Sequence, residues 1–201
     1  MRSARQLDQR RQSGFTLLEV LVVVAVVGIL LMITAPAFLN MINRFKLTGT
    51  AREVTSLMQA ARLESIKLNA PAHVSYDATT NAFVAFVDLD NDLALSAPDR
   101  VLPGTVPLPA KVTFHGPGDF NPMGVNAIDG WDDAPAQDGP IFRSDGSVDR
   151  VGAFRFKDSN DNYLEVRVET PATGRIVLRK FDRGENAFLL NGEGGHRWVW
   201  Y

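Results

Sequence analysis

The 201-residue chain contains no cysteine and only three histidines, and it carries a formal net charge of −2. Without cysteine there is no disulfide framework and no thiol nucleophile. An acidic balance disfavours wholesale nucleic-acid binding, although a local basic patch stays open. The histidines are scattered, and no phosphate loop or metal-ligand spacing accompanies them, so the sequence predicts neither an enzyme nor a bound cofactor.

One long apolar segment is present near the amino terminus. It runs from Phe15 to Leu39, and Glu19 is its single ionisable side chain. The segment exceeds the ~20 residues that a helix needs to cross a bilayer. A carboxylate inside lipid costs roughly 2.5–3.5 kcal/mol, so Glu19 needs a compensating partner. Four arginines precede the segment, which predicts that residues 1–14 stay in the cytoplasm and that the chain after Leu39 lies on the other side of the membrane.

Three interpretations of this segment compete. It could be a signal peptide cleaved at Ala35-Pro36-Ala37, a plain membrane anchor, or a retained helix freed by cleavage after Gly14. The apolar region is longer than that of a usual signal peptide and carries Glu19. A plain anchor explains neither Glu19 nor the glycine before the run. The third interpretation accounts for both.

The segment Gly14-Phe15-Thr16-Leu17-Leu18-Glu19, with its basic leader and with Pro36 inside the apolar run, resembles the type III signal of type IV pilins and type II secretion pseudopilins. The resemblance implies that a prepilin peptidase cleaves between Gly14 and Phe15 and N-methylates Phe15. It also implies that Glu19 pairs with the terminal amine of a neighbouring subunit in a filament. Breaking such a buried pair would cost several kcal/mol. Pro36 predicts a bend or local unwinding of the helix.

Beyond Asn40 the pattern becomes amphipathic. Seven residues recur at alternating spacings of four and three, which predicts one buried stripe of a helix that ends at 69–71: Leu47, Ala51, Val54, Met58, Ala61, Ser65 and Leu68. Small members of the stripe would let a sheet approach closely.

After Pro71 the pattern predicts strands separated by turn residues. The predicted strands are 72–76, 82–88, 111–115, 141–143, 148–157, 163–169 and 175–181. In the last hairpin, a loop at 170–174 places Glu165 opposite Arg179 and Glu169 opposite Arg175. The other face of that hairpin is apolar, with Val168 opposite Ile176.

The order of these features, with Phe142-x-x-Asp145-Gly146 and Gly174-Arg175-Ile176 near the end, resembles the GspH/FimT group of minor pilins and pseudopilins. The resemblance implies an α+β, type IV pilin-like fold, in which a long amino-terminal helix packs on a carboxy-terminal antiparallel β-sheet domain. The expected division is a cleaved leader (1–14), a transmembrane or filament-core helix (15–39), an amphipathic helix half (40–70) and a periplasmic β-rich domain (71–201).

The resemblance also implies the function and the partners. The main expectation is a minor pseudopilin of a bacterial type II secretion system, held in the inner membrane and then incorporated into the pseudopilus. Expected partners are other pilins or pseudopilins, prepilin peptidase and the inner-membrane assembly platform. The alternatives are a FimT-like minor pilin of a type IV pilus, with DNA as a further partner, and a monomeric anchored periplasmic enzyme or sensor.

Three further stretches are candidate sites. Asp88, Asp90 and Asp92 have the alternate spacing of a calcium loop but lack the glycine and distal glutamate of an EF-hand, which favours a solvated turn. Residues 116–140 are rich in glycine, proline and aspartate, and they predict a surface loop or a contact surface for another subunit or secreted cargo.

A local basic stretch is the third. It contains Arg175, Arg179, Lys180 and Arg183, and in FimT-like proteins basic residues of this region contact DNA. Here the predicted carboxylate partners of Arg175 and Arg179 use up part of that charge, which disfavours DNA binding.

Overall fold

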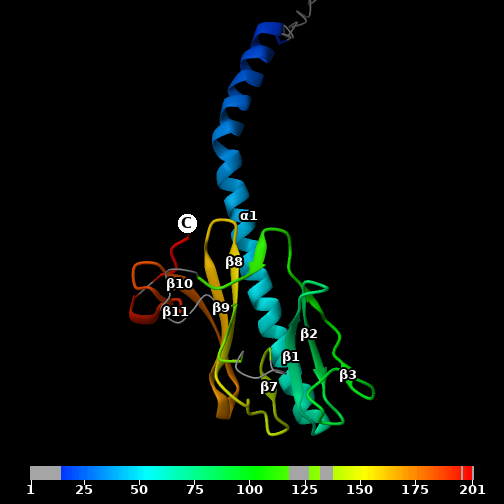
Figure 1. Ribbon diagram of the computed structural model, residues 1–201. Coiled ribbons are helices and arrows are strands. Elements are labelled where there is room, and N and C mark those ends of the chain that lie inside the picture. The colour runs from blue at the N-terminus through cyan, green and yellow to red at the C-terminus, as the bar shows by residue number, and fades with distance from the viewer. Residues whose placement is uncertain (1–14, 118–126, 132–137, 196, 201) are drawn as a thin grey trace, which may run out of the picture. The chain divides into compact units, whose positions relative to one another are not determined.

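The computed structural model describes residues 15–117, 127–131, 138–195 and 197–200. The chain divides into two compact units, Met1–Leu39 and Asn40–Tyr201, and one helix, α1 (Leu17–Leu68), contributes to both. The second unit holds every strand that the described residues form (Figure 1).

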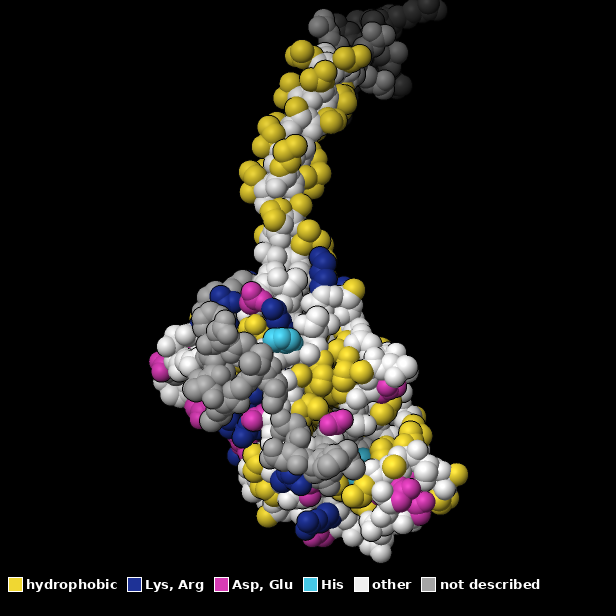
Figure 2. Space-filling model, in the orientation of Figure 1, with side chains coloured by type: hydrophobic (Ala, Val, Ile, Leu, Met, Phe, Trp, Pro, Cys, Tyr) yellow, Lys and Arg dark blue, Asp and Glu magenta, His cyan; other side chains and the backbone are white. Residues whose placement is uncertain are grey.

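The first unit consists of the apolar part of α1. Its side chains from Phe15 to Leu39 are exposed, and Figure 2 shows hydrophobic side chains along its length. This is the one described helix that is long and apolar enough to cross a membrane. The helix continues without a break through Pro36, so the local unwinding expected there is not observed.

The second part of α1 buries the predicted stripe. Six of its seven members are buried, and Leu68 at the end is partly buried. Three more buried residues widen the stripe, namely Asn43, Thr50 and Leu57. Ser65 lies in the stripe without an energetic penalty because its hydroxyl donates to the carbonyl of Arg143, at 3.0 Å.

Two antiparallel sheets make up the rest of the second unit. The first has the order β3-β2-β1-β7, with β4 also paired to β2. Its strands are β1 (Ala72–Asp77), β2 (Ala82–Val87), β3 (Arg100–Val101), β4 (Val106–Pro107) and β7 (Ile141–Phe142).

The second sheet has the order β11-β10-β9-β8-β5, with β6 paired to β8. Its strands are β5 (Val112–Phe114), β6 (Ile128–Asp129), β8 (Gly152–Asp158), β9 (Tyr163–Thr170), β10 (Arg175–Asp182) and β11 (Ala187–Leu189). All seven predicted strands are present, although β8 begins four residues later than predicted, at Gly152. The predicted α+β class, a long helix with antiparallel sheets, is confirmed.

The β9–β10 hairpin has the predicted register with one correction. Glu165 lies opposite Arg179 and Val168 opposite Ile176, as expected. Arg175, however, lies opposite Thr170 and not Glu169, because the register shifts between Arg175 and Ile176.

An aromatic cluster fills the space between the sheets. Phe83 of β2 lies 4.9 Å from Phe154 and 5.5 Å from Phe156, both of β8, between ring centroids. Trp131 lies 4.9 Å from Phe154 and is fully buried. Each such side chain contributes roughly 1.5–3 kcal/mol through burial. These contacts hold the two sheets and α1 in one core.

Candidate functional site

The beginning of α1 holds the residues that the sequence singled out for processing and assembly. Thr16 precedes the first turn, and its hydroxyl accepts a hydrogen bond from the backbone amide of Glu19, at 3.2 Å. A threonine in this position caps the helix by satisfying an amide that has no intrahelical partner. The spacing Thr-x-x-Glu is also that of a capping box. Gly14 lies outside the described residues.

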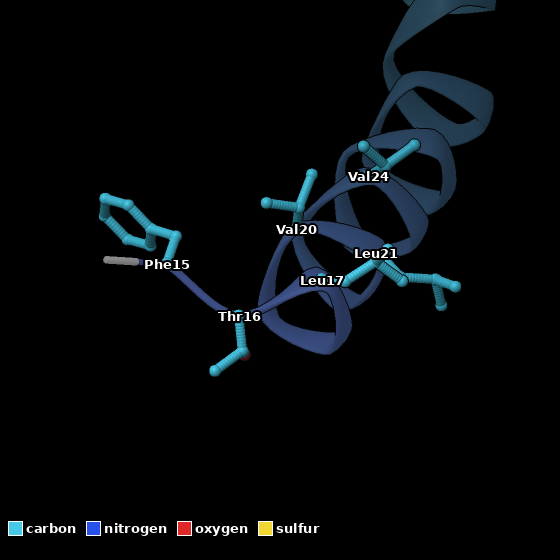
Figure 3. Close-up of a pocket in the computed structure, with 6 residues that line it drawn as sticks. All are labelled: Phe15, Thr16, Leu17, Val20, Leu21 and Val24. Atoms are coloured by element: carbon cyan, nitrogen blue, oxygen red, sulfur yellow. The ribbon is translucent and has the colours of Figure 1, made fainter. Parts of the chain in front are cut away.

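Phe15 and Thr16 lie ahead of this turn, and the side chains of Val20, Leu21 and Val24 project from it (Figure 3). Together with Leu17 these residues line an open groove of about 540 Å³. Phe15 is 83% exposed and Leu17 is 85% exposed, so this helix end presents apolar surface that nothing in the described chain covers. Such a surface in a soluble context would mark an interaction site.

The Glu19 carboxylate lies on this apolar helix and is exposed. No hydrogen bond or ion pair joins its side chain to another residue in the described ranges. A partner for Glu19 therefore has to come from outside those ranges or from another molecule.

The acidic loop that follows β2 is held together by its own carboxylates. Asp88 is fully buried, and it accepts hydrogen bonds from the amides of Asn91, at 2.6 Å, and Leu93, at 3.0 Å. Asp99, which sequence reasoning missed, accepts from the amides of Leu89 and Ser96 and closes the loop. One carboxylate oxygen from each of four residues lies within 4.8 Å of the other three, and these residues are Asp88, Asp90, Asp92 and Asp99.

Like charges and burial shift the pKa values of side chains in and beside this loop. Partial desolvation, with the negative charges of Asp92 and Asp99, raises the pKa of Asp90. His73 lies against the loop with its Nε2 atom 3.5 Å from Asp88, and its ring stacks on Phe86. Burial lowers the pKa of His73 despite the nearby carboxylate. Asp88 thus has a structural use in turn formation. Asp90 and Asp92 are exposed, whereas Asp88 is buried.

The basic stretch of β10 does not form one free cationic face. Arg175 lies 3.5 Å from Glu169, and Arg179 contacts both Glu169 and Glu165. Arg183 donates to the carbonyl of Asp161, at 2.9 Å. Lys180 is 3% exposed, and burial lowers its pKa to about 8.

The arginine–carboxylate pairs belong to a larger network that the sequence did not reveal. Arg155 of β8 is 1% exposed, and it lies 3.3 Å from Glu165 and 2.9 Å from Asp129. Arg167 also contacts Asp129, at 2.9 Å. Burial raises the pKa of Glu165, while the charge of Arg155 opposes that shift. The carboxylates of this network neutralise the arginine charges, so little free positive charge remains to bind an anionic polymer such as DNA.

The two short motifs that carried the family resemblance meet at one residue of α1. Arg62 donates from Nε to the carbonyl of Gly146, at 2.8 Å. Gly174 adopts a left-handed conformation with φ of 58°, and a Cβ atom there would lie 2.9 Å from the Gly146 carbonyl and 3.0 Å from Arg62. These glycines are therefore needed for the close approach of two turns to the helix, not for chemistry.

Part of the stretch 116–140 is anchored in the core. Trp131 lies flat over Gly152, where an added Cβ atom would come within 2.3 Å of the indole. The indole also donates to the carbonyl of Arg150, at 3.3 Å. Phe120 lies outside the described residues. No local pattern indicates this anchor, because only the fold places Gly152 of β8, which has no side chain, next to the tryptophan.

Comparisons with known proteins agree with the sequence motifs. A family model described as the prokaryotic N-terminal methylation motif matches residues 9–35. A second model, described as type II transport protein GspH, matches residues 50–174. The chain is 32% identical over 81 residues to type II secretion system core protein G of Pseudomonas aeruginosa. That match spans 40% of this chain and about half, 54%, of the relative.

A solved structure was also found to be similar. The minor pseudopilin EpsH from the type 2 secretion system of Vibrio cholerae aligns with 67% of this chain and 97% of its own, with a TM-score of 0.46 and 12% identity.

Proposed function

Because this chain belongs to the family of type II transport protein GspH, we propose that it is a minor pseudopilin subunit of a bacterial type II secretion system. In this role it assembles through its amino-terminal helix into the pseudopilus that drives protein export. The observation that carries the proposal is Glu19, a carboxylate without a described partner that lies on an exposed apolar helix and within the matched methylation motif.

Processing supplies the missing partner of Glu19. Cleavage between Gly14 and Phe15 by prepilin peptidase creates a new amine on Phe15, which is then N-methylated. In the filament, this amine of one subunit pairs with Glu19 of its neighbour. The groove beside Phe15 and Leu21 and the remaining apolar surface are covered by neighbouring helices. A charge pair in such surroundings needs both members, because one alone would be buried and unpaired.

The proposed topology follows from the same features. Residues 1–14 are the cytoplasmic leader, 15–39 span the inner membrane, and 40–70 form the amphipathic helix half. Residues 71–201 form the periplasmic β-rich domain. Before assembly the subunit is a single-pass inner-membrane protein that meets prepilin peptidase and the assembly platform. Pro36 lies in the span, where a weakened helix would ease the change from bilayer to filament.

A FimT-like minor pilin of a type IV pilus is the second candidate. It shares the processing signal and the fold class. The relative in a type II secretion system favours the first candidate, and the paired arginines of β10 give no support to DNA binding. Deleting the gene separates the two candidates, since the first predicts loss of exoprotein secretion and the second predicts loss of piliation or twitching.

Mass spectrometry of the mature amino terminus is the direct test. We expect the purified protein to begin at an N-methylated Phe15. An intact Met1, or cleavage after Ala37, would contradict the proposal.

The assembly role of Glu19 is tested by Glu19→Val, with Thr34→Val as a matched control on the same apolar segment. We expect both variants to insert into the membrane normally. Only Glu19→Val should fail to co-purify with crosslinked pseudopilin partners. Normal incorporation of Glu19→Val would refute the charge-pairing account.

A further inference from the structure

The carboxy-terminal tail returns to the part of α1 that directly follows the apolar segment. Arg44 donates to the carbonyl of Trp200, at 3.4 Å, and its guanidinium lies 5.9 Å from the centroid of the Trp200 ring. The Nζ atom of Lys180 lies 5.3 Å from the same ring. Trp198 fixes the tail by donating to the carbonyl of Leu189, at 3.0 Å. Two cations are thus held against one tryptophan.

A groove of about 370 Å³ lies beside this arrangement. It is lined by Met41, Arg44, Phe45, Thr48, Gly49, Arg52 and Trp200. Phe45 is 63% exposed and Met41 is 49% exposed, so its walls offer apolar surface as well as positive charge. None of these described lining residues is acidic. The space next to Gly49 is open, since a Cβ atom there would meet nothing within 4 Å.

Arg44 has an unused donor within the groove wall. Its Nε atom is buried and has no hydrogen-bond partner among the described residues. A buried guanidinium N–H without an acceptor is costly, so a shift of the Arg44 side chain toward an anionic oxygen in the groove would be favourable. A ligand of this groove should therefore combine a negative group with an apolar body.

We propose that this groove binds an anionic phospholipid, with the phosphate at Arg44 and Arg52 and the upper acyl chains along Met41 and Phe45. Arg44 follows Leu39, the end of the apolar segment, by about five residues, or about 7.5 Å of helix. A residue at that distance from a membrane span lies at headgroup level. Tryptophan is typical of that zone, and the long side chain of an arginine near a helix end reaches it.

This assignment rests on the proposed function only in requiring residues 15–39 to span a bilayer. It does not need a filament or a secretion machine. In the membrane, the lipid would hold the start of the domain against the headgroups. On extraction of the subunit, the groove would lose its ligand, so the site belongs to the stage before assembly.

Native mass spectrometry of the full chain, released from a neutral detergent, tests the site. The probes are phosphatidylglycerol and phosphatidylcholine with identical acyl chains, added at equal concentration. We expect selective retention of phosphatidylglycerol. Because each arginine supplies a charge-assisted hydrogen bond to the phosphate, Arg52→Gln and Arg44→Gln should each lower retention about fivefold.

Lys67→Gln is the matched control, because Lys67 is an exposed cation on the same helix, with 62% of its side chain exposed. It should leave lipid retention unchanged. Arg44→Gln also removes a tail contact, whereas Arg52 is an exposed residue whose replacement leaves the fold intact. Equal retention of the two lipids, or unchanged retention in Arg52→Gln, would overturn the proposal.

Two further outcomes are informative. Full competition by glycerol phosphate, which has no acyl chains, would show an anion site alone and overturn the lipid assignment. A dimer that excludes phosphatidylglycerol would assign the groove to a second copy of the chain and overturn it as well. Loss of lipid selectivity with normal Phe15 methylation would leave the proposed function untouched.

Discussion

Replacing Lys180 with methionine should stabilise the β-rich domain at neutral pH. The Lys180 side chain is 3% exposed, and burial lowers its pKa to about 8. The protonated amine is therefore disfavoured in the folded protein relative to the unfolded chain. Methionine keeps the length and apolar stem of lysine while removing the charge.

The magnitude follows from the pKa. The fall from 10.5 to about 8 corresponds to about 3 kcal/mol at 1.36 kcal/mol per unit. Lys180 also donates to the carbonyl of Phe181, at 3.3 Å, and loss of that hydrogen bond costs about 1 kcal/mol. Loss of the contact with the Trp200 ring costs about 0.5–1 kcal/mol. The expected net gain in free energy of unfolding is about 1 kcal/mol.

The pH dependence gives an independent readout. Between pH 8 and 10.5 the unfolded chain keeps the Lys180 proton while the folded chain has lost it, so raising the pH favours folding. This contribution makes the wild-type protein more stable as the pH rises through that window. Lys180→Met should lack the gain. The assay is urea unfolding of the full chain in mild detergent, followed by tryptophan emission at pH 7 and pH 9.5.

Lys157→Met is the matched control. Lys157 is partly exposed, and its hydrogen bond with Asp161 raises its pKa, so its replacement should slightly destabilise the domain. If Lys180→Met destabilises the protein at pH 7, or keeps the wild-type slope between pH 8 and 10.5, the account of Lys180 as a strained buried charge is wrong.

Other expectations concern the core, the turns and one histidine. Gly152→Ala places a methyl group 2.3 Å from the Trp131 indole and should cost about 1–3 kcal/mol, whereas Trp131→Ala should cost about 3–5 kcal/mol, both measured by urea unfolding. Arg62→Ala leaves the Gly146 carbonyl without its charged donor and should cost about 1–3 kcal/mol, with faster amide exchange in that turn. Burial lowers the pKa of His73, so the unfolded chain takes up a proton before the folded chain does as the pH falls below about 6.5. The free energy of unfolding should therefore drop in that range. Thermal unfolding of His73→Gln should show a smaller drop than the wild-type protein.

Much of the fold was predictable because its signals are local. The stripe from Leu47 to Ser65 follows the helical period, and the β9–β10 hairpin follows strict alternation around one turn. The bulge at Arg175 was not predictable, because a bulge leaves no mark in the alternation before it. Strands of two or three residues such as β3 and β6 carry no period at all.

The candidate sites divide in the same way. The processing signal lies within six consecutive residues, so its residue order alone could indicate it. The groove at Arg44 depends on Trp200, which is 156 residues away in the chain. Asp99 closes the acidic loop from ten residues beyond its partner Leu89, and the burial of Arg155 between Asp129 and Glu165 joins three strands. Contacts of this kind come from tertiary packing, which the spacing of residues along the sequence does not indicate.

The way α1 is fastened to the sheets has a mechanical consequence. The fastening is lateral, through the stripe from Leu47 to Ser65 and through the hydrogen bonds of Arg62 and Ser65 to the turn at 143–146. A force applied along the helix axis is therefore shared, as shear, by the contacts of several helical turns. It does not break these contacts one after another. Separating the helix from the sheets would require all these contacts to break together. A pulling force on α1 would therefore move the domain before it unfolds the domain.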